Sequence, residues 1–302
     1  MKAIAIIEKY FWIFFLVGIG IALWLPLPFK MPPYLPEVLL SIILFLVFLK
    51  IDVFDILEHV RNYKLMAFVI FVFMLLIPLL FFFLINIFDG KIALGILLLT
   101  AMPAGVSSPA LTDIAKGNIS LAMSLAMITH LIAPFTVPLL FWLVDIKDLE
   151  INKLLVFKDL ALLVFVPLIF SQIVKKFFSV TIRKTQHVFT SVSIILLFAF
   201  VYITLSSQSN AILGNPFSLL LKTAVLYVVF IILHIAGYLI CYKEKKENKI
   251  AIAVSAAYMN NGMAIVLASS YFGPEMLVFM VLSEVPWNTL LAPFKRIVKN
   301  LG

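Results

Sequence analysis

The 302-residue chain is 64% hydrophobic and only 13% charged, with a mean hydropathy of +1.16. A soluble domain is nearer half apolar and a quarter charged, so this composition excludes a soluble globular protein and indicates an integral membrane protein. The net charge of +8 does not indicate nucleic-acid binding, because Lys and Arg collect in the cytoplasmic loops of membrane proteins. With Cys241 as its single cysteine, the chain has no internal disulfide and no cysteine-based metal cluster.

Apolar runs along the chain predict ten transmembrane helices, since about 20 apolar residues cross a bilayer. The predicted helices cover residues 10–25, 35–49, 64–88, 91–116, 118–144, 154–174, 186–205, 217–242, 248–272 and 275–294. The first run has no small-residue cleavage site before Pro26, so we interpret it as a retained helix rather than a signal peptide. Residues 51–60 resemble a short helix at the membrane interface.

The distribution of basic residues supports this count of helices. With the N-terminus in the cytoplasm, seventeen of the 23 Lys and Arg residues fall on the cytoplasmic side of the membrane. This asymmetry is the one that membrane proteins show, and it predicts a multi-pass plasma-membrane protein with both termini cytoplasmic.

Ten helices divide into two repeats of five, about residues 10–145 and 154–294, and the odd number makes the repeats inverted. The sequence LIAPF at residues 131–135 echoes LAPF at residues 291–294. The fourth helix of each repeat also contains helix-breaking residues, which makes the correspondence more specific. We therefore predict an all-α membrane protein in which the broken fourth and ninth helices cross.

The first break lies within residues 100–109, where Pro103, Gly105 and Pro109 cannot all fit one continuous helix. Ser108 is predicted to cap a second half-helix that has Pro109 at its first position. The second break lies at Asn260-Asn261-Gly262, where Asn-Gly favours a turn and Asn261 is predicted to act as the cap. Such interruptions, near the middle of the bilayer, are typical of secondary transporters.

The start of a half-helix directs free amides and positive partial charge into the protein, which suits a carboxylate or sulfonate. We therefore expect a small organic anion as substrate. The candidate substrate- and ion-binding residues are Ser107, Ser108, Thr112, Ser255, Asn260 and Asn261, and the helix breaks are Pro103, Gly105, Pro109 and Gly262. The alternative is that Ser107 and Ser108 only satisfy the interrupted backbone.

Two titratable residues are predicted within the membrane. Glu284 lies in the middle of the tenth predicted helix, and a carboxylate there is a functional candidate because it is costly to bury. His130 lies in the fifth helix, so both residues are candidates to carry a coupling proton. The alternative is a structural one, in which Glu284 pairs with His130 or Asn288 and His130 only packs.

The sequence contains no zinc-protease, Walker A, diphosphate-binding or Gly-x-Ser-x-Gly motif, so no enzyme activity is predicted. No nucleotide-binding domain is present to drive a pump, and a secondary carrier remains.

The segment MPAGVSSPALTDIAKGN at residues 102–118 and the Asn260-Asn261-Gly262 break resemble the corresponding segments of the bile acid/sodium symporter family. The resemblance implies ten helices in two inverted repeats. It also implies a panel domain of the first, second, sixth and seventh helices and a core domain of the other six. No cofactor is implied beyond a coupling ion, which would be sodium near Ser108 and Asn260.

The chain departs from the sodium-coupled members at several positions. Alignment on the shared motifs keeps Ser108 but places Pro109 where the family has Asn, and Ala122 and Ala126 where it has hydroxyls. Ser255 and Met259 fall near the family's Glu and Gln. The sequence therefore leaves both sodium and proton coupling open.

The related arsenite-efflux permeases share a Glu-Val-Pro in the last helix, as at residues 284–286. Their metalloid-binding Cys has no counterpart in the fourth helix of this chain. The predicted function is a secondary active transporter of a small organic anion. The alternatives are a proton-coupled or facilitative carrier of the same superfamily, including arsenite-type efflux, a non-transporting membrane receptor and a passive channel. The expected partners are the substrate and the lipid bilayer, with the protein as a monomer or homodimer.

Overall fold

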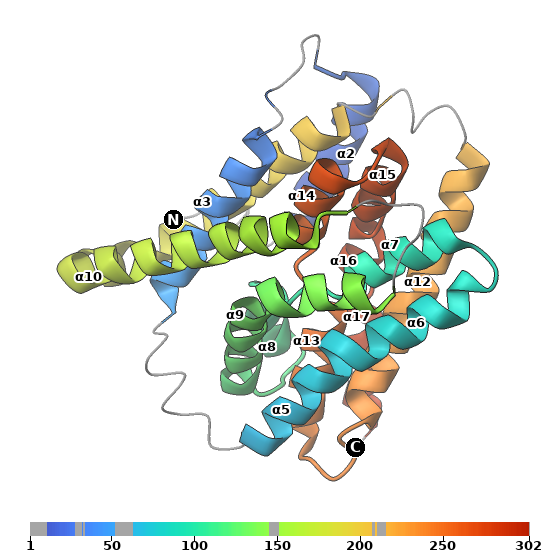
Figure 1. The fold of residues 1–302 in the computed structure, drawn as a ribbon. Helices are drawn as coiled ribbons and strands as arrows, with labels where there is room; N and C mark the ends of the chain where they lie inside the picture. Colours follow the sequence, from blue (N-terminus) through green and yellow to red (C-terminus); the bar gives the residue numbers. More distant parts are fainter. Residues whose placement is uncertain are drawn as a thin grey trace. The chain divides into compact units, whose positions relative to one another are not determined.

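The computed structural model describes residues 11–27, 32, 34–51, 63–144, 151–206, 209 and 216–301, which form helices joined by short connections (Figure 1). Within these ranges there is no β-strand, only an isolated antiparallel bridge between Ala104 and Met259. The helices long and apolar enough to cross a membrane are Tyr63–Asn86, Ile119–Leu143, Lys153–Gln186, Phe217–Leu239 and Pro274–Asn300. The predicted all-helical membrane class is therefore confirmed. The predicted interfacial segment at residues 51–60 lies almost wholly outside the described residues.

The chain divides into two compact units, of which the first is Met1–Asp52 with Asp159–Pro216. It contains α2 (Phe11–Trp24), α3 (Leu35–Lys50) and most of α10 (Lys153–Ser206). The Gln172 amide of α10 donates a hydrogen bond to the Phe48 carbonyl of α3 over 3.2 Å. The Tyr202 hydroxyl donates to the Leu25 carbonyl just after α2 over 2.9 Å. These side chains satisfy carbonyls that the helix ends leave free.

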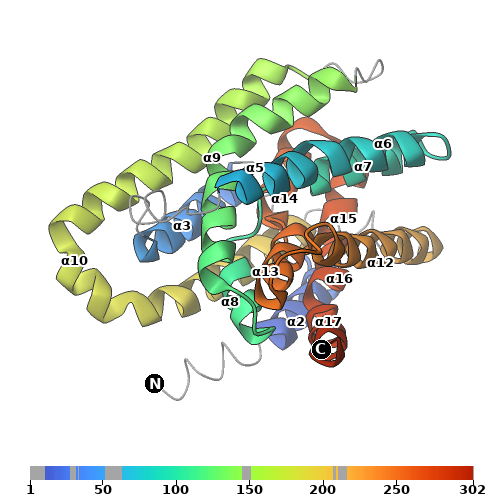
Figure 2. The same cartoon turned by 90° about the horizontal axis from the view of Figure 1, so that it is seen from below.

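The two helices predicted at residues 154–174 and 186–205 both lie within α10, where two helical parts are joined at a kink rather than by a loop. The backbone stays helical through this segment as α10, apart from a kink at Phe178, where φ is −123° and ψ is 26°. Residues 168–206 contain neither Gly nor Pro, so nothing in the basic connection stops the helix. The kink changes the direction of the helix, and Figure 2 shows α10 curving back.

The second unit, Val53–Lys158 with Phe217–Gly302, begins with α5 (Tyr63–Phe71), a π-helical turn η1 (Val72–Leu76) and α6 (Ile77–Asn86). The prediction was one continuous α-helix over residues 64–88. Pro78 has no N–H, and its ring would collide with the carbonyl four residues earlier in a regular α-helix. The wider π-turn relieves this collision, and such turns are frequent at functional sites.

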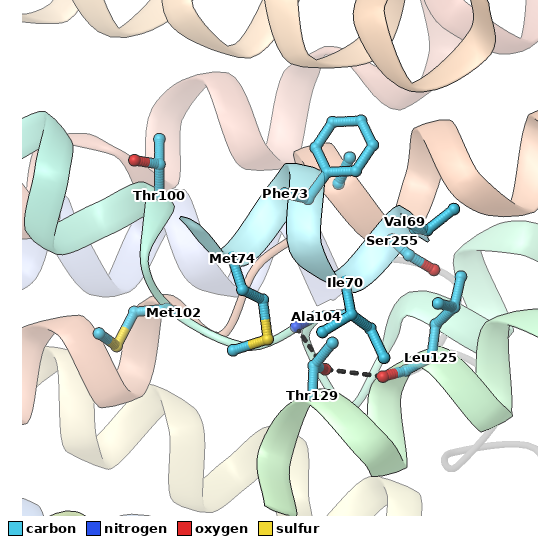
Figure 3. A pocket seen from close by; sticks show the side chains of 11 residues that line it. Val69, Ile70, Phe73, Met74, Thr100, Met102, Ala104, Leu125, Thr129 and Ser255 are labelled. Carbon is cyan, nitrogen blue, oxygen red and sulfur yellow. Dashed lines mark hydrogen bonds between the residues drawn. The ribbon is translucent and has the colours of Figure 1, made fainter. Parts of the chain in front are cut away.

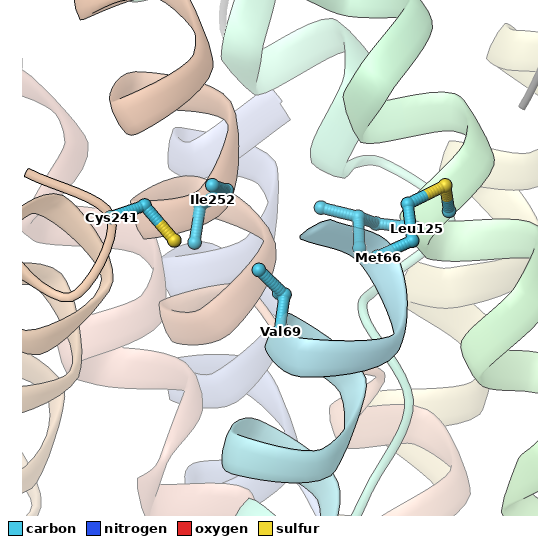
Figure 4. Close-up of a cluster of buried hydrophobic side chains, with 5 residues drawn as sticks. All are labelled: Met66, Val69, Leu125, Cys241 and Ile252. Atoms are coloured by element: carbon cyan, nitrogen blue, oxygen red, sulfur yellow. The ribbon is translucent and has the colours of Figure 1, made fainter. Parts of the chain in front are cut away.

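Two later helices of this unit, α12 (Pro216–Leu239) and α13 (Lys246–Ala257), approach each other closely at Gly237. A Cβ atom at Gly237 would lie 2.5 Å from the Ala253 Cα, so only glycine fits there. Apolar side chains from α5, α9, α13 and the turn after α12 form a cluster (Figure 4). Its buried members are Met66, Val69, Leu125, Cys241 and Ile252. Burial raises the pKa of the Cys241 thiol, which suits a packing role.

The remaining helices of the unit are short or capped. They are α7 (Gly90–Thr100), α8 (Ser108–Ile114), α9 (Ile119–Leu143), α14 (Asn261–Tyr271), α15 (Pro274–Leu282), α16 (Glu284–Thr289) and α17 (Leu291–Asn300). The Asp89 carboxylate caps α7 and the Asn118 side chain caps α9. The last predicted helix was expected to end at residue 294, but its helical segments continue to Asn300 because no Gly or Pro follows Pro293 before that point.

Candidate functional site

Two segments without helical structure meet inside the second unit. The first lies between the end of α7 at Thr100 and the start of α8 at Ser108, and the second between the end of α13 at Ala257 and the start of α14 at Asn261. The Gly105 amide donates to the Tyr258 carbonyl over 2.6 Å, and the Asn260 amide donates to the Pro103 carbonyl over 2.8 Å. Backbone groups that leave their own helices thus satisfy each other, as an apolar environment requires.

Gly105 is required by this close approach. A Cβ atom at Gly105 would lie 2.7 Å from the Tyr258 carbonyl oxygen and 3.2 Å from that of Met259. Real Cβ atoms do not approach backbone so closely, and a carbonyl in the pairing cannot move aside without losing its hydrogen bond. Gly105 therefore acts by allowing the two segments to pair.

Side chains from two other helices hold the paired segments. The Ala104 amide donates to the Thr129 hydroxyl of α9 over 3.1 Å, and that hydroxyl donates to the Leu125 carbonyl over 2.7 Å (Figure 3). The Trp287 indole N–H of α16 donates to the Met259 carbonyl over 3.3 Å. Neither Thr129 nor Trp287 was among the predicted site residues. In the sequence, Thr129 could have been predicted as a site residue only from its position as a polar neighbour of His130 within an apolar helix.

The predicted caps are each wrong by one residue. Ser107, not Ser108, precedes α8, and its hydroxyl makes no cap hydrogen bond. Asn260, not Asn261, caps α14, and its Oδ1 atom accepts from the Met263 amide over 3.2 Å. The pairing with Pro103 holds Asn260 outside the helix, and only a residue there can turn its side chain back onto the first turn.

His130 and Asn260 form a hydrogen bond whose direction the structure defines. The Ala126 carbonyl can only accept, so the His130 Nδ1 atom, 2.7 Å away, carries the proton. The Nε2 atom therefore accepts from the Asn260 amide nitrogen over 2.9 Å, while the Asn260 oxygen faces the Met263 amide. Of the two partners considered for Glu284 from the sequence, the hydrogen bond is made by Asn288, over 3.3 Å.

A cavity of about 30 Å³ lies beside the first paired segment (Figure 3). Its wall includes Met102 and Ala104 from that segment, Phe73 and Met74 from the π-turn, and Ser255 from α13. The Thr100 and Thr129 side chains also line it. Its volume suits a single water or a small ion, and the hydroxyls supply polar partners within an apolar wall.

Several predicted site residues have buried oxygens without a hydrogen-bond partner. The Ser108 and Thr112 side chains are completely buried, and Ser255 and Asn261 are 7% and 3% exposed. The orphan atoms are Ser108 Oγ, Thr112 Oγ1, Ser255 Oγ and Asn261 Oδ1. Ser107 is only half-buried. Because buried polar groups are normally paired, these four oxygens are candidates to contact an ion, a water or a substrate.

Comparisons with known proteins agree with a transport function. A family model for the SBF-like CPA transporter family matches residues 9–289. The chain is also 31% identical, over 207 residues, to a Bacillus subtilis (strain 168) protein named as the uncharacterized sodium-dependent transporter YocS. That match covers 67% of this chain and 62% of the relative's length. The family match extends over nearly the full chain, including the two paired segments and the helices that hold them, and this protein belongs to the SBF-like CPA transporter family.

Proposed function

We propose that this protein is a secondary active transporter of the plasma membrane that couples movement of a small organic anion to a sodium gradient. The observation that carries the proposal is the pairing of two interrupted segments at Ala104 and Met259, beside buried oxygens without partners. Secondary transporters bind substrate and coupling ions where interrupted helices meet inside the bilayer. The name of the Bacillus subtilis relative supports sodium as the coupling ion.

The proposed architecture is ten transmembrane helices in two inverted repeats, about residues 10–145 and 154–294, with both termini cytoplasmic. Each repeat would contain an interrupted pair followed by a further helix, namely α7, α8 and α9 in the first and α13, α14 and α15 in the second. The two compact units support a panel domain of the first, second, sixth and seventh helices and a core domain of the other six. We propose that alternating access moves one unit against the other.

The proposed contacts to substrate and ion are Ser107, Ser108, Thr112, Ser255, Asn260 and Asn261. The first turn of α14, which is 11 residues long, would favour the negative charge of the substrate. Sodium prefers oxygen ligands, and it is proposed near Ser108 and Asn260. Because the Asn260 oxygen already accepts from Met263, the orphan hydroxyls of Ser108 and Ser255 are the better ligands in this conformation.

Proton coupling is the second candidate, and the burial of Glu284 favours it. The carboxylate is 6% exposed and lies in a helix expected to cross the membrane. A titratable group is costly to bury there, so its presence indicates a function. His130 is the weaker proton carrier, since its Nε2 atom already accepts from Asn260.

The first experiment compares thermal unfolding of the purified protein in NaCl and in KCl at matched ionic strength. An ion that binds only the folded state stabilises it by about 2.7 kcal/mol at a hundredfold excess over its dissociation constant. We expect a saturable stabilisation specific to sodium. If the unfolding temperature is the same in both salts and changes with pH instead, sodium coupling is contradicted and proton coupling is favoured.

The second experiment measures entry of ²²Na⁺ into proteoliposomes with and without an external organic anion, using taurocholate, lactate and glutarate as probes. Symport predicts that at least one probe accelerates sodium entry, and that Ser108→Ala removes the acceleration. Liposomes without protein are the control for leakage. Sodium entry that no probe changes would contradict symport of these anions, whatever the first experiment shows.

A further inference from the structure

Glu284 is a buried carboxylate without a basic partner. It lies at the start of α16, directly after Ser283, and is 6% exposed. Among the residues that the structure describes, no Lys or Arg forms an ion pair with it, and the ion pairs found involve Glu275 and Asp113. Burying an ionised carboxylate away from water costs several kcal/mol unless other groups compensate. The groups that surround Glu284 therefore indicate what compensates it.

Two carboxamides lie beside Glu284 in this conformation. The Asn288 nitrogen lies 2.8 Å from the Glu284 carbonyl and 3.3 Å from its Oε2 atom. The Asn261 side chain, from the first residue of α14, donates from its nitrogen to the hydroxyl of the adjacent Ser283 over 2.9 Å. Neutral donors from two separate helices thus meet at Ser283 and Glu284.

The oxygen atoms of both carboxamides are buried and have no hydrogen-bond partner. This is a second observation, independent of the carboxylate, because nothing about Glu284 requires the Asn261 and Asn288 oxygens to be left unpaired. Each oxygen shares a carbon with a nitrogen that already faces Glu284 or Ser283. A half-turn of either amide would therefore exchange a donor for an acceptor at the carboxylate.

The backbone adds another acceptor. Pro286 has no N–H, so the Leu282 carbonyl lacks the donor that a regular helix would supply four residues later. The Ser283 hydroxyl lies next to it and donates to the Met280 carbonyl. The residues where α14 meets the junction of α15 and α16 thus supply one carboxylate, two amide oxygens, a hydroxyl and a carbonyl.

This set of atoms matches one kind of ligand. It contains oxygen only, which selects hard cations over the transition metals that thiolates and imidazoles bind. It carries one negative charge, which suits a monovalent ion. We propose that Glu284, Asn261 and Asn288 bind a monovalent metal cation, most simply sodium, at a site separate from the cavity beside Ala104. The ion would connect α14 to α16 and turn the two amide oxygens inward.

The site is tested by thermal unfolding of the full-length protein, with NaCl, KCl or LiCl replacing N-methyl-D-glucamine chloride at constant ionic strength and pH. Equilibrium binding of ²²Na⁺ to the same samples gives the number of sites. We expect saturable stabilisation by sodium, and Glu284→Gln should weaken sodium binding at this site at least tenfold and remove one bound ion per chain. Asn288→Ala, which deletes one ligand but keeps the carboxylate, should weaken it severalfold.

Glu275→Gln is the matched control, because it neutralises an exposed carboxylate of the neighbouring α15 and should leave the number of bound ions unchanged. If Glu284→Gln does not fold, Asn288→Ala decides the question. Unchanged sodium binding in the foldable variants, or stabilisation that depends on pH and equally on every salt, would overturn the proposal. The site would stand even if no organic anion accelerated sodium entry, so its failure is distinguishable from failure of symport.

Discussion

The two interruptions that meet at Ala104 and Met259 are built by different chemistry. The first, residues 101–107, depends on backbone properties, since Pro103 cannot continue a helix and Gly105 allows the close approach. No side chain caps the helix that follows it. The second, residues 258–260, contains neither Pro nor Gly. It is held by polar side chains, with Asn260 capping α14 and donating to His130.

The difference indicates how each segment would respond to a ligand. A break enforced by Pro and Gly stays broken whatever binds nearby, and the Ser108, Thr112 and Ser255 hydroxyls around it are unpaired. A break held by side-chain hydrogen bonds can rearrange when those bonds are exchanged for contacts with an ion. We therefore expect the first segment to act as a fixed support and the second as the part that adapts.

The largest effect is expected when the pairing itself is blocked. Gly105→Ala places a methyl group 2.7 Å from the Tyr258 carbonyl, so the two segments must separate or distort. We expect the free energy of unfolding in detergent to fall by about 1–3 kcal/mol, as for overpacked sites. Gly20→Ala is the control, because nothing lies within 4 Å of its added Cβ atom. If the two variants unfold alike, the close approach at Gly105 does not limit the fold.

The features that could be predicted from the sequence are those that a single residue type enforces. Pro103 and Gly105 locate the first interruption, and the apolar runs locate most of the helices. Gly262, which was predicted as a helix break, instead lies in the first turn of α14, directly after the second interruption. What could not be predicted depends on contacts between distant residues. The use of Asn260 rather than Asn261 as a cap follows from its pairing with Pro103, and the role of Thr129 follows from where Ala104 lies. The basic residues between residues 174 and 186 predict a loop, whereas α10 passes through this segment with only a kink at Phe178.

A smaller effect is expected at the second interruption. Asn260→Ala removes the cap of α14 and the donor to His130, and loss of a cap costs about 0.5–2 kcal/mol. Asn260→Ser keeps a side-chain acceptor for the Met263 amide without burying a charge, and its short hydroxyl cannot cap α14 and also replace the amide donor to the His130 Nε2 atom. The Ser variant should therefore lie between wild type and Ala in unfolding free energy. If Ser is no more stable than Ala, the cap to Met263 contributes nothing measurable.

The smallest effect is expected far from the crossing, at the outer ends of the helices that lead to it. Glu275 of α15 pairs with Lys91 of α7 over 3.1 Å and with Lys222 of α12 over 2.9 Å. Exposed pairs of this kind contribute about 0.2–1 kcal/mol each, and salt screens them. The Lys91 side chain is 81% exposed and that of Lys222 only 14%, so the two pairs are screened unequally.

Lys222→Met should therefore destabilise the protein more than Lys91→Met, and 1 M salt should reduce the cost of Lys91→Met by the larger fraction. Thermal unfolding at low and high salt measures both effects. If either lysine variant cost as much as Gly105→Ala, the outer ends would hold the interrupted helices as firmly as their pairing does. If the lysine variants lower the unfolding free energy only slightly, the crossing is the place where these helices are fixed. An ion or substrate bound there would then act on the part of the unit that determines its conformation.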